Sequence, residues 1–467
     1  MSLTAAAFLL TFATGLGLAV LRNPIYGLYT YVAVFYLDAP HRWWGTGLPD
    51  LRWSLIAAGV TAVSLLRVTA DSARPPWYRT LPAVWLIAYT TWLLIQSPWA
   101  LDPAEHRECL ILFAKFTIVY FLVYRLIDTP ARVADFLLAH VLGCLYLGLI
   151  ALGMDVPGGR LDGVGGPGID DSNTLGMHAA TAAIVGAMLI FATRGWRRAA
   201  AVISAPFILN MIVQTGSRGA FLALFAGGVT LLVLRPREKT RLFLALAIVA
   251  VLGFGYVASA TFWERMQTIE SAVKQDADID DSAEGRIEQF KAGIRMFAAH
   301  PLGVGHRGFV VLSPSYLEQK YLTSAGARSS HNTFITTLVE QGVPGAVMYS
   351  LLWAWVLKEC ARARGWAKRT RPLLEVSLIA AVSGGLIVVL IGGQFADFLK
   401  VEVQIWLLGL LASLEGYYAT TSRGSINSGK ADDVRSAIAA RHRAYRTPVF
   451  HKDPSTERAH VGRFGRN

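Results

Sequence analysis

The chain has 467 residues, of which 54% are hydrophobic and only 16% charged, and its mean hydropathy is +0.42. Soluble domains usually carry about 25% charged residues, so the composition predicts a membrane protein and excludes an ordinary soluble enzyme. The net charge of +12 suggests an anionic partner, but residues 419–467 alone hold ten basic and four acidic residues, half of that excess. Such a basic tail favours anionic lipid headgroups over nucleic acid.

Apolar runs recur from the N-terminus onward, and each is close to the roughly 20 residues that a helix needs to cross a bilayer. Their number predicts an all-α polytopic membrane protein with about 12 transmembrane helices. The first two runs, Leu3–Leu21 and Ile25–Leu37, are separated by Arg22, Asn23 and Pro24, so whether both span is left open. The first run has no basic n-region and no cleavage site, and we expect it to remain as a helix.

Basic residues gather in alternate connections, which predicts that these connections face the cytoplasm. One long connection then faces outward and shows helical spacing of apolar residues from Ala283 to Ala299, which predicts an amphipathic helix on the outer surface. Long loops are usually functional, so we expect the chemistry there. The sequence predicts four segments: N-terminal transmembrane helices in 1–261, the large outward loop in 262–330, C-terminal transmembrane helices in 331–418, and a disordered basic cytoplasmic tail in 419–467.

Polar residues inside or beside the early apolar runs are secondary candidates. Lys115 lies within the run from Leu110 to Val123, where an ammonium either has a function or extends towards the interface. Asp171 and Asn173 precede a helix that is expected to begin near Thr174. Either residue can cap that helix, and both can also bind the hydroxyl groups of a sugar.

Two arginines are candidate anion-binding residues. Arg218 lies between two apolar runs and beside Gly216 and Gly219, at the outer edge of the membrane, where its charge needs an anion or several acceptors. Arg286 lies near the start of the predicted amphipathic helix, where its fork can combine with free backbone N–H groups to hold a phosphate. The alternatives are an arginine that extends to the interface and a solvated arginine, respectively.

His331 and Asn332 end the long outward loop. An imidazole with a pKa near 6.5 can accept a proton from a sugar hydroxyl near neutral pH. The alternative is structural, since Ser330 or His331 can cap the helix that follows.

No residue pattern predicts a metal site. The long loop contains an acidic cluster, at Asp276, Asp278, Asp280 and Asp281. It fails the calcium-loop pattern because Asp281 stands where glycine is needed and Ile287 where the bidentate glutamate belongs, so a solvated loop is the favoured interpretation. The three cysteines, Cys109, Cys144 and Cys360, are too widely spaced for a metal motif or a disulfide framework.

Several short motifs in the second half of the chain together resemble the O-antigen ligase and polymerase superfamily. They are Ser217-Arg218-Gly219, Gly285-Arg286, the run from His300 to Gly305, His331-Asn332 and the run from Glu340 to Gly345. The resemblance implies a GT-C-type fold in the bacterial inner membrane, a periplasmic site, and an undecaprenyl-diphosphate-linked glycan as donor. It implies inverting transfer without metal or other cofactor. Arg218 and Arg286 would hold the diphosphate, Asn332 would bind substrate, and His331 would orient or deprotonate the acceptor.

Within this family the ligases transfer the glycan to a sugar hydroxyl of lipid A–core, and we expect that reaction here. O-antigen polymerases and O-linked protein glycosyltransferases share the same C-terminal signature, so both remain alternatives. A flippase or other transporter of lipid-linked sugars is an alternative of a different class. The chain shows no internal repeat, and its long outward loop favours chemistry at one surface.

Overall fold

The computed structural model describes residues 2–68, 74–154, 160–166, 168–257, 281–367 and 373–418. Within these ranges the secondary structure is entirely helical. The predicted aspartates 276, 278 and 280, the first part of the long loop and the basic tail 419–467 lie outside the described residues. All described residues except Tyr418 belong to one compact unit, Met1–Tyr417.

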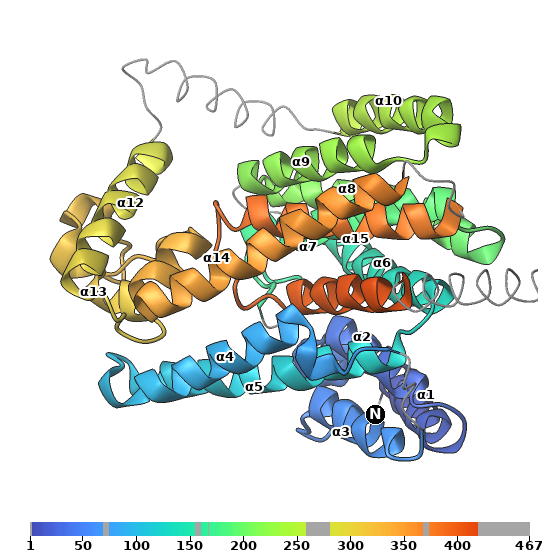
Figure 1. The fold of residues 1–467 in the computed structure, drawn as a ribbon, viewed down its shortest axis with the longest axis horizontal. Coiled ribbons are helices and arrows are strands. Elements are labelled where there is room, and N and C mark those ends of the chain that lie inside the picture. The colour runs from blue at the N-terminus through green and yellow to red at the C-terminus, as the bar shows by residue number, and fades with distance from the viewer. Residues whose placement is uncertain are drawn as a thin grey trace, which may run out of the picture. The chain divides into compact units, whose positions relative to one another are not determined.

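The helices follow the apolar runs closely (Figure 1). The α-helices are α1 (Leu3–Leu21), α2 (Ile25–Leu37), α3 (Trp53–Leu65), α4 (Leu81–Gln96), α5 (Pro103–Leu126), α6 (Pro130–Leu152), α7 (Ser172–Ala192), α8 (Trp196–Thr215), α9 (Arg218–Leu234), α10 (Thr240–Val257), α12 (Asp281–Ala299), α13 (Gly308–Tyr316), α14 (Thr333–Ala367), α15 (Leu373–Gly392) and a last helix over 402–418. Short 3-10 turns are η1 (Ala39–His41), η2 (Trp43–Gly45), η3 (Trp77–Arg79), η4 (Ser97–Trp99), η6 (Arg237–Lys239) and η7 (Gln319–Tyr321).

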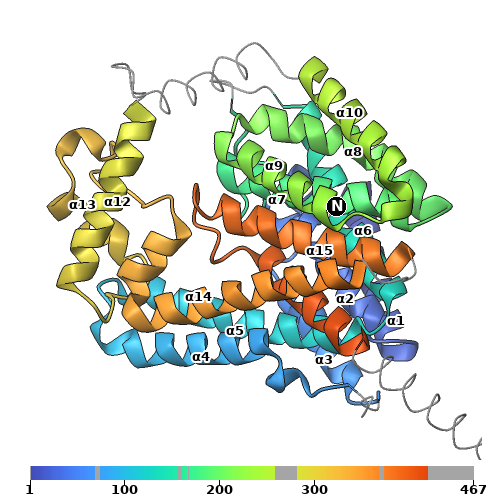
Figure 2. The ribbon, with the colours of Figure 1, turned by 45° about the horizontal axis from the view of Figure 1, so that its top comes forward.

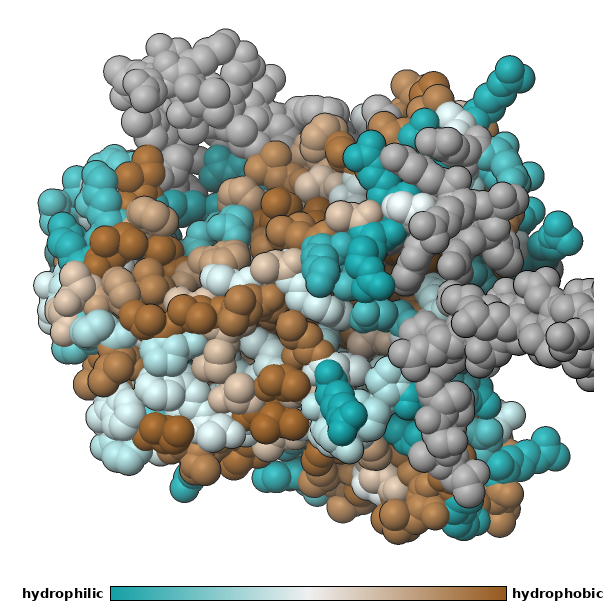
Figure 3. Space-filling view, in the orientation of Figure 1, coloured by the Kyte–Doolittle hydropathy of each residue, from teal (hydrophilic) through white to brown (hydrophobic). Residues whose placement is uncertain are grey.

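Six of the described helices, α1, α5, α6, α7, α8 and α15, are long and apolar enough to cross a membrane. This supports the prediction of a polytopic membrane protein. Of the two first runs, α1 has 19 residues, whereas α2 has 13 and is shorter than a full span requires. Apolar side chains are also exposed on α14, including Val343, Val347 and Leu351. Hydrophobic residues occupy much of the face of the molecule in Figure 3.

Helices α7 and α15 lie at the centre of the bundle and pack against each other and against α9. Small residues allow these helices to approach closely. A Cβ added to Gly227 of α9 would lie 2.6 Å from Val388, and one added to Gly384 of α15 would lie 2.7 Å from Ile184. Close packing through small residues is the usual way in which helices associate where lipid removes the hydrophobic driving force. The central helices therefore form a rigid support for the loops at their ends.

Helix α14 is bent where Gly342 adopts φ 65° and ψ −161°, two residues before Pro344. Because proline has no N–H, the carbonyl of Glu340 loses its partner within the helix. That carbonyl accepts instead from the N–H of Gly305 at 2.9 Å and from Nε2 of Gln96 at 2.7 Å. The two family-like motifs, 300–305 and 340–345, thus form one packed joint in the described structure.

We expect Gly342→Ala to destabilise this joint strongly. The backbone conformation of Gly342 is essentially restricted to glycine, and an added Cβ would overlap the backbone of Leu302. Together these effects cost about 2–4 kcal/mol of unfolding free energy. Thermal unfolding in detergent checks this. Gly228→Ala, in open space on α9, is the matched control and should be neutral or stabilising. Equal unfolding midpoints for the two variants would contradict the proposed role of the bend.

Helices α12 and α13 pack together on the first turns of α14, at the left end of the bundle in Figures 1 and 2. Their shared core is apolar and includes Ala292, Met296 and Phe309. The predicted amphipathic helix is present, but the apolar residues Ile287, Phe290 and Ile294 are exposed instead of covering that core. The sequence pattern therefore predicts the helix and its apolar face, but the other face of the helix packs against the core.

Candidate functional site

The candidate site lies at the end of the bundle where α7, α9 and α14 begin. Asp171 is the N-cap of α7, where its carboxylate accepts from the backbone N–H groups of Asn173 at 2.9 Å and Thr174 at 3.2 Å. The Asn173 side-chain oxygen accepts from Nη2 of Arg160 and from the hydroxyl of Ser217, both at 3.0 Å. Asp171 therefore caps α7, which is one of the two roles expected from the sequence. Asn173 links α7 to Ser217, the residue before Arg218.

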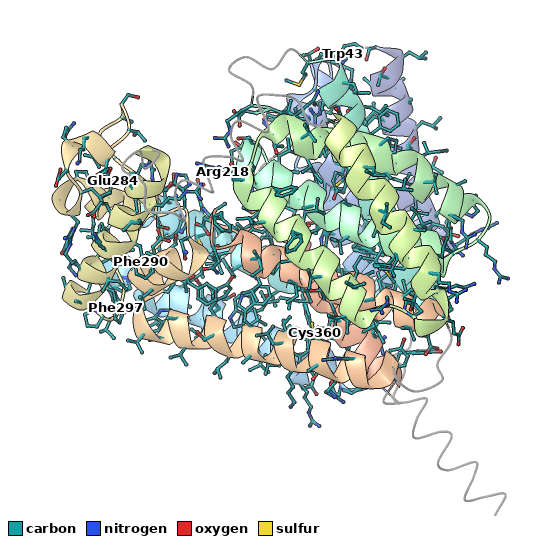
Figure 4. All side chains as sticks on the ribbon, turned by 90° about the horizontal axis from the view of Figure 1, so that it is seen from above. Trp43, Arg218, Glu284, Phe290, Phe297 and Cys360 are labelled. Carbon is teal, nitrogen blue, oxygen red and sulfur yellow. The ribbon has the colours of Figure 1, made fainter. Side chains whose placement is uncertain are left out.

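Arg218 is the first residue of α9, next to a tight turn. Gly216 ends α8 with φ 56°, and Ser217 caps α9 by accepting from the N–H of Ala220 at 3.2 Å. Figure 4 shows Arg218 at the end of α9 that is turned towards α12, where Glu284 is labelled. A Cβ on the neighbouring Gly219 would lie 2.5 Å from Cβ of Phe395. The Ser-Arg-Gly motif therefore places Arg218 beside the loop that follows α15.

Arg286 approaches the same loop from α12. Its guanidinium carbon lies 5.7 Å from the centre of the Phe395 ring. The helix begins at Asp281 and not at Ala283, so Arg286 lies in the second turn, beyond the four free N–H groups of the N-terminus. The prediction that these backbone N–H groups assist Arg286 in binding a phosphate is therefore wrong, because the helix starts earlier than the apolar pattern does. Phe395 therefore lies beside Arg286 of α12 and beside Gly219, the residue after Arg218.

His331 has a strained backbone. Its φ is 49°, an unusual value for a residue other than glycine, and Nε2 lies 3.1 Å from the hydroxyl of Ser329. The cap of α14 is instead Asn332, whose side-chain oxygen accepts from the N–H of Ile335 at 3.1 Å. The side-chain nitrogen of Asn332 donates to the side-chain oxygen of Gln394 at 3.3 Å. Strained residues of this kind gather at functional sites, and capping does not account for this histidine.

Charges from four segments act on His331. Burial lowers the pKa of its imidazole to about 4, and the positive charges of Arg328 and Arg286 act in the same direction. The carboxylates of Asp171 and Asp397 oppose the shift. Thus Arg286 and Asp171, which the sequence also singles out, both lie within electrostatic reach of His331. The ring is neutral near neutral pH and can accept a proton.

Arg328 lies in a loop without a recognisable pattern, so the sequence alone does not single it out. In the orientation that satisfies both of its polar atoms, the buried amide of Gln289 accepts from Nε of Arg328 at 3.0 Å. The same amide donates to the carbonyl of Ser330 at 3.3 Å. Helix α12 therefore supplies Arg286 directly and orients Arg328 and the segment before His331 through Gln289.

The loop between α15 and the last helix was also missed. Thr333 ties this loop to α14, because its N–H donates to the carbonyl of Gly393 and its hydroxyl to the carbonyl of Ala396. At the far end of the loop, Lys400 Nζ lies 3.1 Å from Nε2 of His306, whose Nδ1 lies 3.0 Å from the Glu340 carboxylate. These buried contacts fix both ends of the segment that carries Phe395 and Asp397.

Lys115 is exposed on α5, and the structure assigns it no hydrogen bond or ion pair with the other described candidates. A different group of metal-ligand side chains is buried between α6 and α7, where ligand atoms of His140, Cys144 and His178 lie within 4.8 Å of one another. The hydroxyl of Tyr36 bonds to both histidines and lies 2.7 Å from His178 Nε2. The tyrosine occupies the space between the ligands, so this arrangement forms a hydrogen-bonded cluster.

Residues 203–350 match the family model of the O-antigen ligases. The match confirms the resemblance seen in the sequence and covers less than half of the chain. It includes Arg218, Arg286 and His331, whereas Asn173 and Phe395 lie outside it. Members of this family are glycosyltransferase-like enzymes, either ligases or polymerases. No curated protein gives a match to this chain.

Proposed function

We propose that the protein is an O-antigen ligase, which transfers a glycan from undecaprenyl diphosphate to a sugar hydroxyl of lipid A–core. The observation that carries this proposal is the grouping of His331 with Arg286, Arg328 and Asp171, beside the loop that also contacts the Arg218 motif. The proposed enzyme has about 12 transmembrane helices and a GT-C-type fold, with its site on the periplasmic face of the inner membrane. It needs no metal.

The arginines suit the leaving group of this reaction. Breaking the bond between the anomeric carbon and the diphosphate oxygen leaves additional negative charge on the diphosphate. Fixed guanidinium groups stabilise that charge by bidentate hydrogen bonds, as a metal ion does in nucleotide-sugar enzymes. Arg218 and Arg286 are the proposed direct ligands, and Arg328, held by Gln289, adds positive charge near His331.

His331 suits the acceptor side. The acceptor oxygen attacks the anomeric carbon with inversion, and its proton passes to the neutral imidazole. If the Ser329 hydroxyl accepts the Nε2 proton, Nδ1 is left as the acceptor. The diphosphate also neutralises Arg286 and Arg328, two of the charges that depress the pKa of His331. Donor binding should therefore strengthen the base at the stage when it is needed.

The proposed acceptor can be tested with purified protein and one lipid-linked donor. We expect transfer to lipid A–core, detected as a mass increase of the acceptor by one donor glycan. Undecaprenyl-linked glycan and a serine-containing protein are offered in parallel. Ladder formation on the undecaprenyl carrier would identify a polymerase, and a glycosylated protein would identify the protein-modifying class. Donor movement across vesicles without any transfer would instead support the transporter alternative.

A further inference from the structure

A second basic site lies at the opposite end of the bundle from His331. A cavity of about 290 Å³ is formed where α7 and η6 end and α8, α10 and α15 begin. Three cationic side chains line it, those of Arg194, Arg198 and Lys239. Its remaining walls are partly apolar and include Phe191, Leu242 and Leu373. The cavity thus combines concentrated positive charge with a hydrocarbon-like surface.

The three cations of the cavity differ from neighbouring arginines in their ion pairs. Arg132 and Arg197, at the same end of the bundle, are paired with Asp128 at 2.8 Å and Asp135 at 2.7 Å. Within the part of the chain that the structure describes, no ion pair is found for the three cavity cations. The adjacent Thr193 hydroxyl is already bonded to the carbonyl of Leu189 at 2.6 Å. Because the three cations line one cavity, a single external anion can bind all of them at once.

The position of the cavity identifies the kind of anion. It lies at the ends of three helices long enough to span a membrane, α7, α8 and α15, where hydrocarbon gives way to headgroups. Trp196, in the same turn, is 65% exposed, as expected of an aromatic residue at that level. A small soluble anion would make no apolar contact with the wall of the cavity, whereas a phospholipid would cover this wall with an acyl chain.

We propose that Arg194, Arg198 and Lys239 bind the phosphate of an anionic phospholipid, with an acyl chain against Phe191, Leu242 and Leu373. This site is independent of the transfer reaction. By the distribution of basic residues it faces the cytoplasmic leaflet. The lipid would cross-link the ends of α7, α8, α10 and α15, and so stabilise the two helices at the centre of the bundle.

The test is lipid binding to detergent-purified protein, followed by native mass spectrometry and by thermal unfolding. Phosphatidylglycerol, phosphatidylcholine and inorganic phosphate are added separately. In the variant carrying Arg194→Gln, Arg198→Gln and Lys239→Gln, affinity for phosphatidylglycerol should fall about a hundredfold, since each basic residue near a headgroup contributes about fivefold. Binding of phosphatidylcholine should be unchanged.

Arg241→Gln is the matched control, because it removes an exposed cation from the first turn of α10 that does not line the cavity. It should retain the affinity of the unmodified protein. An equal loss in this control would assign binding to diffuse surface charge and overturn the proposal. Equal protection by inorganic phosphate would also overturn it, in favour of a soluble anion. The three single variants, each expected to lose about fivefold, give the same test if the triple variant does not fold.

Discussion

Arg286→Ala and Arg218→Ala should each reduce glycan transfer by about 10² to 10³, the usual loss when one fixed stabiliser of developing charge is removed. The Arg286 side chain lies over the Phe395 ring, and Gly219, the residue after Arg218 on α9, packs against Phe395. Replacement by lysine should restore only part of the rate, because an ammonium lacks the bidentate fork. Single-turnover rates with saturating acceptor measure the effect on chemistry directly.

Each arginine has a control on its own helix. Arg295 lies further along α12, is exposed and donates to the carbonyl of Tyr316, and Arg235 follows the opposite end of α9. Arg295→Ala and Arg235→Ala should keep transfer within about twofold of the unmodified protein, since surface substitutions have small effects. Near-normal transfer in both Arg218→Ala and Arg286→Ala would remove the diphosphate assignment. Equal losses in the control variants would point to a general defect in folding.

The sequence predicted the helices well because an apolar run of membrane length has few alternatives to a helix. It also predicts Arg218, Arg286 and His331 as site residues, each of which lies in a recognisable motif, and the structure places Arg286 within electrostatic reach of His331. The described part of α12 already includes Asp281 and Ser282, ahead of the predicted start at Ala283, so Arg286 lies beyond the free backbone N–H groups that the sequence pattern leads one to expect beside it. Helix boundaries depend on local capping, which apolar spacing does not reveal.

Other parts of the site depend on contacts between distant segments. Gln289 orients Arg328 across 39 residues of sequence, and Phe395 meets both Gly219 and Arg286 from a loop near the end of the chain. No spacing in the sequence predicts which residues Gln289 and Phe395 contact. The motifs at 300–305 and 340–345 were likewise visible, but their role in satisfying the backbone of a bent helix became clear only from the structure.

His331→Ala should lower turnover by about 10² to 10⁴ while donor binding persists, because a general base acts mainly in the transition state. His331→Asn should be similarly slow, since an amide is no base near neutral pH. Asn332 already caps α14, so neither substitution removes the cap. His41→Ala, which changes an exposed histidine, should retain full activity.

The pH profile gives a sharper test of the same assignment. Burial and the charges of Arg328 and Arg286 lower the pKa of His331 to about 4, so the ring is neutral above that pH and loses its accepting lone pair as pH falls through it. The acid limb of kcat/KM, which reports the free enzyme, should therefore lie near pH 4. The limb of kcat should lie at higher pH, because the bound diphosphate neutralises the two arginines and raises the pKa of the ring. Residual activity of His331→Ala should lack both limbs. Full activity in His331→Asn, with the acid limbs intact, would exclude His331 as the base and leave a site that acts by diphosphate stabilisation and positioning.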